Sequence, residues 1–175
     1  ALDAAILIIS AQDGVTGHTR TLWRLLEKYN VPTLLFLNKT DMTGIDKEKI
    51  ESDIISSLSQ SIVPYPFTDM EVIAEKDDEI LEKYLSGEEI DKDDISKIIS
   101  QRKLFPLLSG SALKNQGTRD ILFVLEHFFT CKETTEDFGA LLYKVSRDKT
   151  GKKLSHLKIT GGKLKAKDEI GGEKV

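Results

Sequence analysis

The sequence contains a single cysteine, Cys131, which excludes an intrachain disulfide and fits a reducing cytoplasm. No apolar run reaches the roughly 18 residues that a membrane-spanning helix needs, and no segment resembles a signal peptide. The three histidines, His18, His127 and His156, are scattered and form no i, i+4 pair, so we expect no metal site. These features predict a cytoplasmic protein that does not contact a membrane.

Neither sign of charge dominates strongly. The formal net charge of −4 argues against a free-standing nucleic-acid binder. A composition of 39% apolar and 31% charged residues is typical of a soluble protein with a hydrophobic core. A length of 175 residues suits one domain plus a fragment, or two small domains. The first residues lead directly into an apolar run without an initiating Met, so we expect the chain to be a fragment of a longer protein.

Two apolar runs and the segment between them predict an α/β fold. Residues 4–10 and 31–37 are nearly continuous apolar runs, as expected of parallel strands that are buried on both faces. Residues 19–30 carry leucines at helical spacing between them. Strand, helix and strand at this length form one crossover of a parallel sheet.

The next part of the chain, over about residues 44–103, is predicted to be mostly helical. Ser61 to Ile73 contains two prolines and predicts a short extended piece with a turn. A third strand-like run follows at residues 104–109, where Pro106 favours a strand start or an edge. The expected helices cover residues 46–58, 77–86, 91–103 and 118–129.

After a polar stretch the hydrophobic period changes from that of helices to that of strands. Residues 132–137 have no period and predict a linker. Residues 138–145 and 153–159 alternate, and Asp148-Lys149-Thr150-Gly151 between them is typical of a hairpin turn. We therefore expect two parts, residues 1–131 and an antiparallel β module over residues 138–175.

The most informative motif is Asn38-Lys39-Thr40-Asp41, which ends the second apolar run. Open α/β sheets bind ligands at the carboxyl ends of their strands. A carboxylate at that edge can accept two parallel hydrogen bonds from the N1–H and N2–H₂ groups of guanine, a pair that adenine does not offer. With Gly110-Ser111-Ala112-Leu113 at the end of the later run, the sequence predicts guanine-nucleotide recognition.

These residues resemble translational GTPases, in particular elongation factor G and the related ribosomal protection proteins that give tetracycline resistance. The resemblance rests on the segments 8–15, 31–33, 38–41, 44–46, 78–87 and 110–115. It covers the whole chain and implies the later half of a P-loop-NTPase-like G domain, with parallel strands and a helical insertion, followed by the start of the β-barrel second domain. Because elongation factor G carries a larger insertion, the resistance-protein branch fits better.

The resemblance assigns roles to the first loop. Asp41 would accept hydrogen bonds from guanine N1–H and N2–H₂. Asn38 would brace the two base-recognition loops and approach N7. The aliphatic stem of Lys39 would lie along the base plane.

It also assigns roles to the second loop. Ala112 would present its backbone N–H to guanine O6, and Ser111 would hold the first loop in place. Leu113 would pack over the base. A pocket of this kind can reject the wrong base by about 10⁴-fold or more, because the wrong base leaves buried polar groups unpaired.

The sequence supplies no residues for phosphoryl transfer. It contains no Gly-x-x-x-x-Gly-Lys-[Ser/Thr], the segment that cradles phosphates. The resemblance implies that the family's Asp-x-x-Gly segment, and the His that follows it, lie upstream of Ala1, so we expect the Mg²⁺ ligands to lie elsewhere in the parent protein. We predict no catalytic residues and no metal ligands in this chain. We expect it to hold only the guanine half of the GTP or GDP site and not to hydrolyse GTP.

Several alternatives remain open. The parent protein is either a ribosome-dependent GTPase, of the resistance or the elongation factor G type, or a non-catalytic scaffold that lacks the phosphate loop. The C-terminal segment is basic and faces either ribosomal RNA or solvent. An exposed sheet edge would favour self-association, since unpaired strands pair readily with a second copy.

Overall fold

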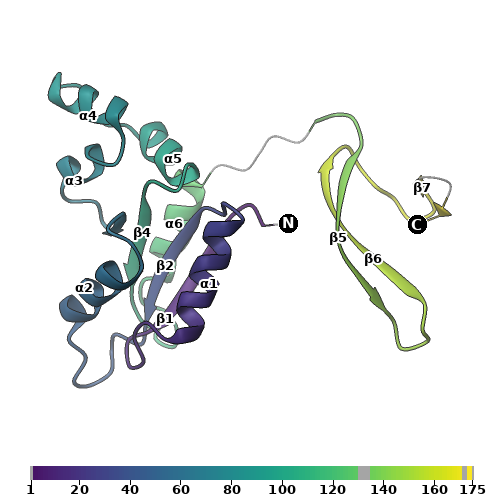
Figure 1. Ribbon diagram of the computed structural model, residues 1–175, viewed down its shortest axis with the longest axis horizontal. Coiled ribbons are helices and arrows are strands. Elements are labelled where there is room, and N and C mark those ends of the chain that lie inside the picture. Colours follow the sequence, from purple (N-terminus) through teal and green to yellow (C-terminus); the bar gives the residue numbers. More distant parts are fainter. Residues whose placement is uncertain (1, 130–134, 171–172, 175) are drawn as a thin grey trace. The chain divides into compact units, whose positions relative to one another are not determined.

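The computed structural model describes residues 2–129, 135–170 and 173–174. The chain divides into two compact units, residues 2–130 and 131–175. The first unit is an α/β layer structure built on a four-stranded parallel sheet with the order β1-β2-β4-β3, which confirms the predicted fold class. Its strands are β1 (Ala5–Ser10), β2 (Thr33–Asn38), β3 (Ile62–Pro64) and β4 (Phe105–Ser109) (Figure 1).

The first crossover joins β1 to β2 through helix α1 (Gly17–Lys28). Thr16 caps the helix, because its hydroxyl accepts the N–H of Thr19 while the Thr19 hydroxyl accepts the N–H of Thr16. The helix predicted from the sequence, residues 19–30, is displaced by two residues from this one. The two strands run parallel in full register, so the ends of both strands lie at the same edge of the sheet.

Strand β2 is buried on both faces, as its continuous apolar run predicted. Leu35 and Leu37 belong to a core with Trp23 of α1 and Ile54 of α2 (Lys47–Leu58). Leu34 and Phe36 belong to a second core, on the other face of the sheet.

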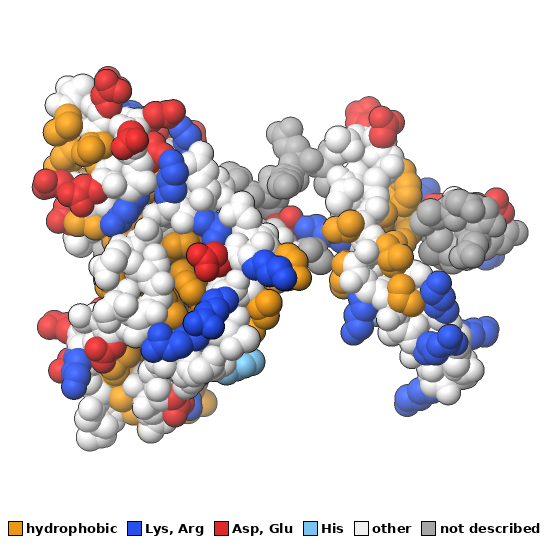
Figure 2. All heavy atoms as spheres, viewed as in Figure 1, with side chains coloured by type: hydrophobic (Ala, Val, Ile, Leu, Met, Phe, Trp, Pro, Cys, Tyr) orange, Lys and Arg blue, Asp and Glu red, His pale blue; other side chains and the backbone are white. Residues whose placement is uncertain are grey.

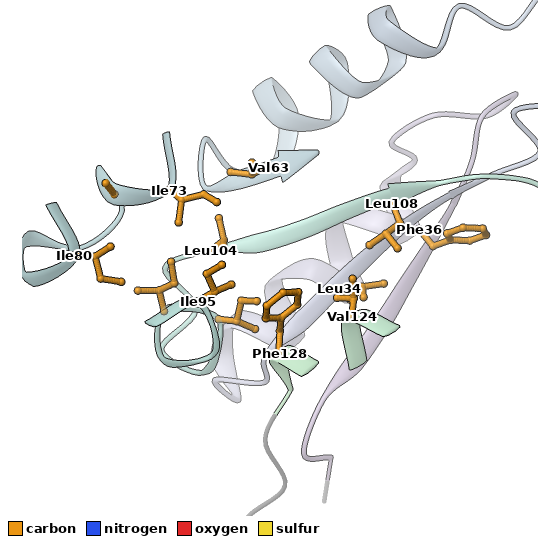
Figure 3. Packing of buried hydrophobic residues seen from close by; sticks show 13 residues of the cluster. Leu34, Phe36, Val63, Ile73, Ile80, Ile95, Leu104, Leu108, Val124 and Phe128 are labelled. Atoms are coloured by element: carbon orange, nitrogen blue, oxygen red, sulfur yellow. The ribbon is translucent and has the colours of Figure 1, made fainter. Parts of the chain in front are cut away.

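The core on that other face contains residues of α6 (Thr118–Phe128), among them Val124 and Phe128, which lie near Leu34 in Figure 3. It also contains Leu108 and isoleucines of three helices, α3 (Met70–Ala74), α4 (Asp78–Leu85) and α5 (Lys92–Ser100). Each such side chain contributes about 1.5–3 kcal/mol on full burial. Packing on both faces therefore fixes the position of the strand whose end carries the candidate site.

The expectation that β1 is buried on both faces is wrong. Leu7 and Ile9 are buried in the core that contains Trp23 of α1, whereas Ile6 and Ile8 are 42% and 62% exposed. The physical reason is position, because β1 is an edge strand of the sheet. In the part of the chain that the structure describes, no helix covers these two side chains fully.

The insertion between β2 and β4 is mostly helical. Besides α2 it contains α3 (Met70–Ala74), α4 (Asp78–Leu85) and α5 (Lys92–Ser100), which Figure 1 shows grouped together. An aspartate caps the N-terminus of every one of these helices. Helix α3 was not predicted, since residues 61–73 were expected to be extended with a turn. Figure 2 shows acidic side chains gathered over α3 and α4.

Strand β4 tolerates Pro106 although it lies between two other strands. The N–H of Phe105 donates to Ser61 O, and Leu107 O accepts the N–H of Tyr65, so these two residues bond toward β3. Pro106, whose nitrogen has no hydrogen, therefore faces β2, and pairing with β2 begins only at Leu107. The predicted strand start is confirmed, whereas the alternative of an edge strand is wrong.

The second unit contains the predicted antiparallel hairpin, β5 (Gly139–Arg147) and β6 (Lys153–Gly161). In its turn, Asp148 Oδ1 accepts the backbone N–H groups of Thr150 and Lys152. A short second pair, β7 (Glu169–Ile170) and β8 (Glu173–Lys174), follows. Figure 2 shows lysine and arginine side chains along the hairpin.

The predicted linker over residues 132–137 is described only in part. Thr135, within that segment, already pairs with Gly161 of β6. Cys131 and residues 132–134 lie outside the described residues.

Candidate functional site

The two motifs that the sequence predicts to form one site lie at the same edge of the sheet. Leu37 of β2 is in register with Ser109 of β4, so both loops leave the sheet side by side. The N–H of Gly110 donates to Leu37 O at 2.9 Å, and the N–H of Thr40 donates to Gly110 O at 3.1 Å. Two loops that are far apart in the sequence are thus joined by backbone hydrogen bonds.

Asn38 connects the two loops through its side chain. Its Oδ1 accepts the N–H of Lys39 and the N–H of Ala112, both at 2.9 Å. Its backbone oxygen accepts the N–H of Ala11 at 2.8 Å, which ties the same residue to the loop after β1. The bracing geometry expected of Asn38 is therefore present in the structure, while a contact with guanine N7 stays a prediction.

Asp41 is held as a carboxylate. Its side chain is 19% exposed, and Lys114 Nζ lies 2.9 Å from its Oδ2. Hydrogen bonds from Lys114 and then Ser111 lower the pKa of Asp41 below its ordinary value. At neutral pH this group is an acceptor only, as two donors of a base would require.

The second loop is closed by its own backbone. The N–H of Ser111 donates to Gln116 O at 3.1 Å, and the N–H of Gln116 donates to Ser111 O at 2.9 Å. Ser111 is buried, and its hydroxyl accepts the N–H of Lys114 at 3.4 Å. Ser111 also helps to lower the pKa of Asp41, so it acts on both motifs, and its role in holding the first loop stays a prediction.

Two glycines make that closure possible. A Cβ on Gly110 would lie 2.2 Å from Gln116 O, closer than any real contact. Gly117 has a φ of +77°, and a Cβ there would lie 2.7 Å from Ser109 O. The sequence interpretation quoted Gly110 as part of a motif but gave neither residue this role. The positions of these two glycines, one at each end of the loop, could have indicated from the sequence that the loop closes on itself.

The remaining predicted residues lie on the outside of the loops. Lys39 is exposed and adopts a left-handed backbone, with φ +66°. Leu113 is 96% exposed. Both side chains are accessible to a base placed at the loops, and neither is part of the core. Their contacts with a base stay predictions.

Sequence reasoning missed Lys114. The ion pair with Asp41 joins the tip of the second loop to the end of the first. No sequence motif indicates this pair, because the fold brings the two residues together.

Among the described residues, no group of three or more His, Cys, Asp or Glu side chains could hold a metal ion. No helix of the described residues is long and apolar enough to cross a membrane.

Comparison with known families matches residues 1–131 to the GTP-binding domain of elongation factor Tu. The chain belongs to this family of translational GTPase domains. The match covers the first unit, including both loops of the site. The family is one of GTP-binding domains, which agrees with the guanine recognition predicted from the two motifs.

The translational GTPase relatives are similar along nearly the whole chain. The tetracycline resistance protein TetW of Butyrivibrio fibrisolvens is 36% identical over 97% of this chain and 30% of its own length. TetM from transposon Tn916 of Enterococcus faecalis is 35% identical with the same coverage. Elongation factor G of Ureaplasma urealyticum is 28% identical over 93% of this chain and 34% of its own. The chain therefore spans about a third of the length of these relatives.

The fold has a counterpart among solved structures. A protein from Thermus thermophilus superposes with a TM-score of 0.76 at 22% identity, over 95% of this chain and 33% of that protein. This likeness supports the architecture of the chain, and at this identity it carries no argument about function.

Proposed function

We propose that the two loops bind the base of GTP or GDP and that this chain is the base-recognising part of a ribosome-associated GTPase. The observation that carries the proposal is the bridge from Asn38 to Ala112, with ionised Asp41 beside it. Asp41 accepts N1–H and N2–H₂ of guanine, and the Ala112 N–H turns from Asn38 to O6. Asn38 contacts N7, while Lys39 and Leu113 cover the two faces of the base.

Ser111 supports this arrangement from within the protein, since it is buried and its donation helps to keep Asp41 ionised. Hydrogen bonds to a charged group are stronger than those between neutral groups, so the pair on Asp41 favours guanine over a base that lacks the two donors. Adenine would place its amino group against the Ala112 N–H, where two donors meet. The proposal therefore predicts strong selection of guanine over adenine.

The test is a titration of the isotope-labelled chain with guanosine 5′-monophosphate (GMP), adenosine monophosphate and xanthosine monophosphate, followed by amide chemical shifts. We expect saturable shifts at residues 38–41 and 111–114 with GMP only. Asp41→Asn replaces one acceptor by a donor, so GMP binding should fall and xanthosine monophosphate, which has a carbonyl at C2, should bind instead. Equal shifts with the guanine and adenine compounds would refute the proposal.

We propose further that the parent protein protects ribosomes against tetracycline in the cytoplasm, as the names TetW and TetM of its relatives suggest. The higher identity to these proteins than to elongation factor G supports this choice. Growth of cells that carry the full-length gene, with and without tetracycline, separates a resistance protein from an elongation factor G translocase. An upstream coding segment with Gly-x-x-x-x-Gly-Lys-[Ser/Thr] separates both from a non-catalytic scaffold.

The chain itself is expected to leave GTP intact, because its sequence has no phosphate-cradling segment. Mg²⁺ would be held by other parts of the parent protein. Release of phosphate from GTP above the background rate would refute this expectation. The exposed edge strand β1, with Ile6 and Ile8 open to solvent, also supports self-association of the chain.

A further inference from the structure

The groups proposed to bind guanine have partners within the protein. The Ala112 N–H donates to Asn38 Oδ1, and Lys114 Nζ donates to Asp41 Oδ2. The two contacts differ in kind. Asn38 belongs to the end of β2, whereas Lys114 lies at the tip of the second loop with a side chain that is 55% exposed. The role inferred below for Lys114 rests on the proposed function, in which Asp41 binds guanine.

The ammonium group of Lys114 occupies a position that guanine needs. A carboxylate that accepts both N1–H and N2–H₂ uses both of its oxygens, one for each donor. Lys114 holds Oδ2 at 2.9 Å, so a base that uses both oxygens of Asp41 must displace the ammonium group or share Oδ2 with it. A base with a single donor at this edge, such as hypoxanthine, which has N1–H and no 2-amino group, can bind to the oxygen that Lys114 does not hold.

We propose that Lys114 is a specificity-determining residue that competes with the 2-amino group of guanine for Asp41. Guanine must compete with the ammonium group for Oδ2, by displacing it into water or by sharing the oxygen with it, and hypoxanthine need not. Lys114 therefore lowers the affinity for guanine and narrows the gap between guanine and hypoxanthine. Because the lysine is more than half exposed, its displacement costs little. The effect corresponds to a factor of about two to five in affinity, the range measured for exposed ion pairs.

The experiment compares the chain with its Lys114→Met variant, which keeps most of the length of the side chain and removes the charge. Both are titrated with GMP and with inosine monophosphate, which carry the same phosphate and ribose. We expect Lys114→Met to bind GMP about two to five times more tightly and inosine monophosphate equally well. The gain should shrink in high salt, since screening weakens the ion pair in the unmodified chain.

Lys49→Met is the matched control, because Lys49 is an exposed lysine of α2 that is not part of the site. It reports any general effect of lost positive charge on the phosphate group, and should change neither affinity. The carboxyl resonance of Asp41 supplies a readout without nucleotide. Since Lys114 is the largest cause of its lowered pKa, that pKa should rise in Lys114→Met and stay unchanged in Lys49→Met.

The outcomes separate this inference from the proposed function. If Asp41→Asn abolishes GMP binding while Lys114→Met leaves the ratio of the two affinities unchanged, the site binds guanine and the competition is refuted. If Lys114→Met weakens both compounds, Lys114 is a ligand contact and the inference is likewise refuted. If GMP does not bind the unmodified chain saturably, the proposed function fails, and the competition with it.

Discussion

Asn38→Ala tests the geometry of the candidate site without any nucleotide. The substitution removes the Oδ1 atom that accepts the N–H groups of Lys39 and Ala112. An intramolecular hydrogen bond contributes about 0.5–1.5 kcal/mol, so the two bonds together amount to about 1–3 kcal/mol. Both donor residues are exposed and water can replace the lost acceptor, which places the expected loss near the lower end of that range.

The local effect should be larger than the global one. Amide hydrogen exchange of Ala112 should accelerate toward the rate of an unprotected amide, because the acceptor of its N–H in the structure is Asn38 Oδ1. The N–H of Thr40, which donates to Gly110 O, should stay protected, since that bond does not involve a side chain. Asn38→Asp is the control, because a carboxylate keeps the acceptor and should keep Ala112 protected. Unchanged exchange of Ala112 in Asn38→Ala would show that the bridge does not exist.

Three further predictions concern a glycine of the second loop, a helix cap and the edge strand. Gly117→Ala should lower the free energy of unfolding, measured by chemical denaturation, by about 1–3 kcal/mol. Its φ of +77° is strained for alanine, and the Ser109 oxygen leaves no room for a Cβ. A variant as stable as the unmodified chain would contradict this prediction. Asp77→Ala should cost about 1–2 kcal/mol through loss of the α4 cap. The ion pair with Lys103 and the cap hydrogen bonds lower the pKa of Asp77, so the stabilisation by Asp77 is complete above its ordinary pKa of about 3.9. This stabilisation is lost as the pH falls through the lowered pKa. The denaturation curves of Asp77→Ala and of the unmodified chain should therefore converge in acid. Ile8→Lys should shift sedimentation from dimer toward monomer, and a monomeric unmodified chain at all concentrations would refute association through β1.

The parts of the fold that the sequence predicted are those in which local pattern and tertiary environment agree. The apolar run of β2 is buried on both faces, and its end meets the end of β4 because parallel strands in one sheet align their carboxyl ends. From the sequence alone, that rule predicts that Asp41 and Ala112 lie close together. Helices α2, α4 and α6 lie within a residue or two of their predicted bounds, because their apolar periods are regular.

The parts that could not be predicted depend on neighbours or on very short segments. The residues of β1 have the same apolar character as those of β2, yet Ile6 and Ile8 are exposed, since composition does not say which strand lies at an edge. Helix α3 has five residues, too few for a helical period to emerge, and it follows two prolines that favour extended backbone. What starts it is Asp69, whose carboxylate accepts the N–H of Glu71 at 3.0 Å.

The same distinction explains why the site residues were predictable while their partners were not. Asn38 and Asp41 carry recognisable chemistry at a recognisable place, so the sequence alone identifies them as candidates. The ion pair of Asp41 with Lys114 requires a loop that closes on itself, and closure requires Gly110 and Gly117 at its two ends. Substituting either glycine should therefore weaken the ion pair without touching either charged residue. In Gly117→Ala, the pKa of Asp41 should rise toward its ordinary value if the loop opens, and a carboxyl titration that matches the unmodified chain would show that the loop keeps Lys114 in place despite the strain.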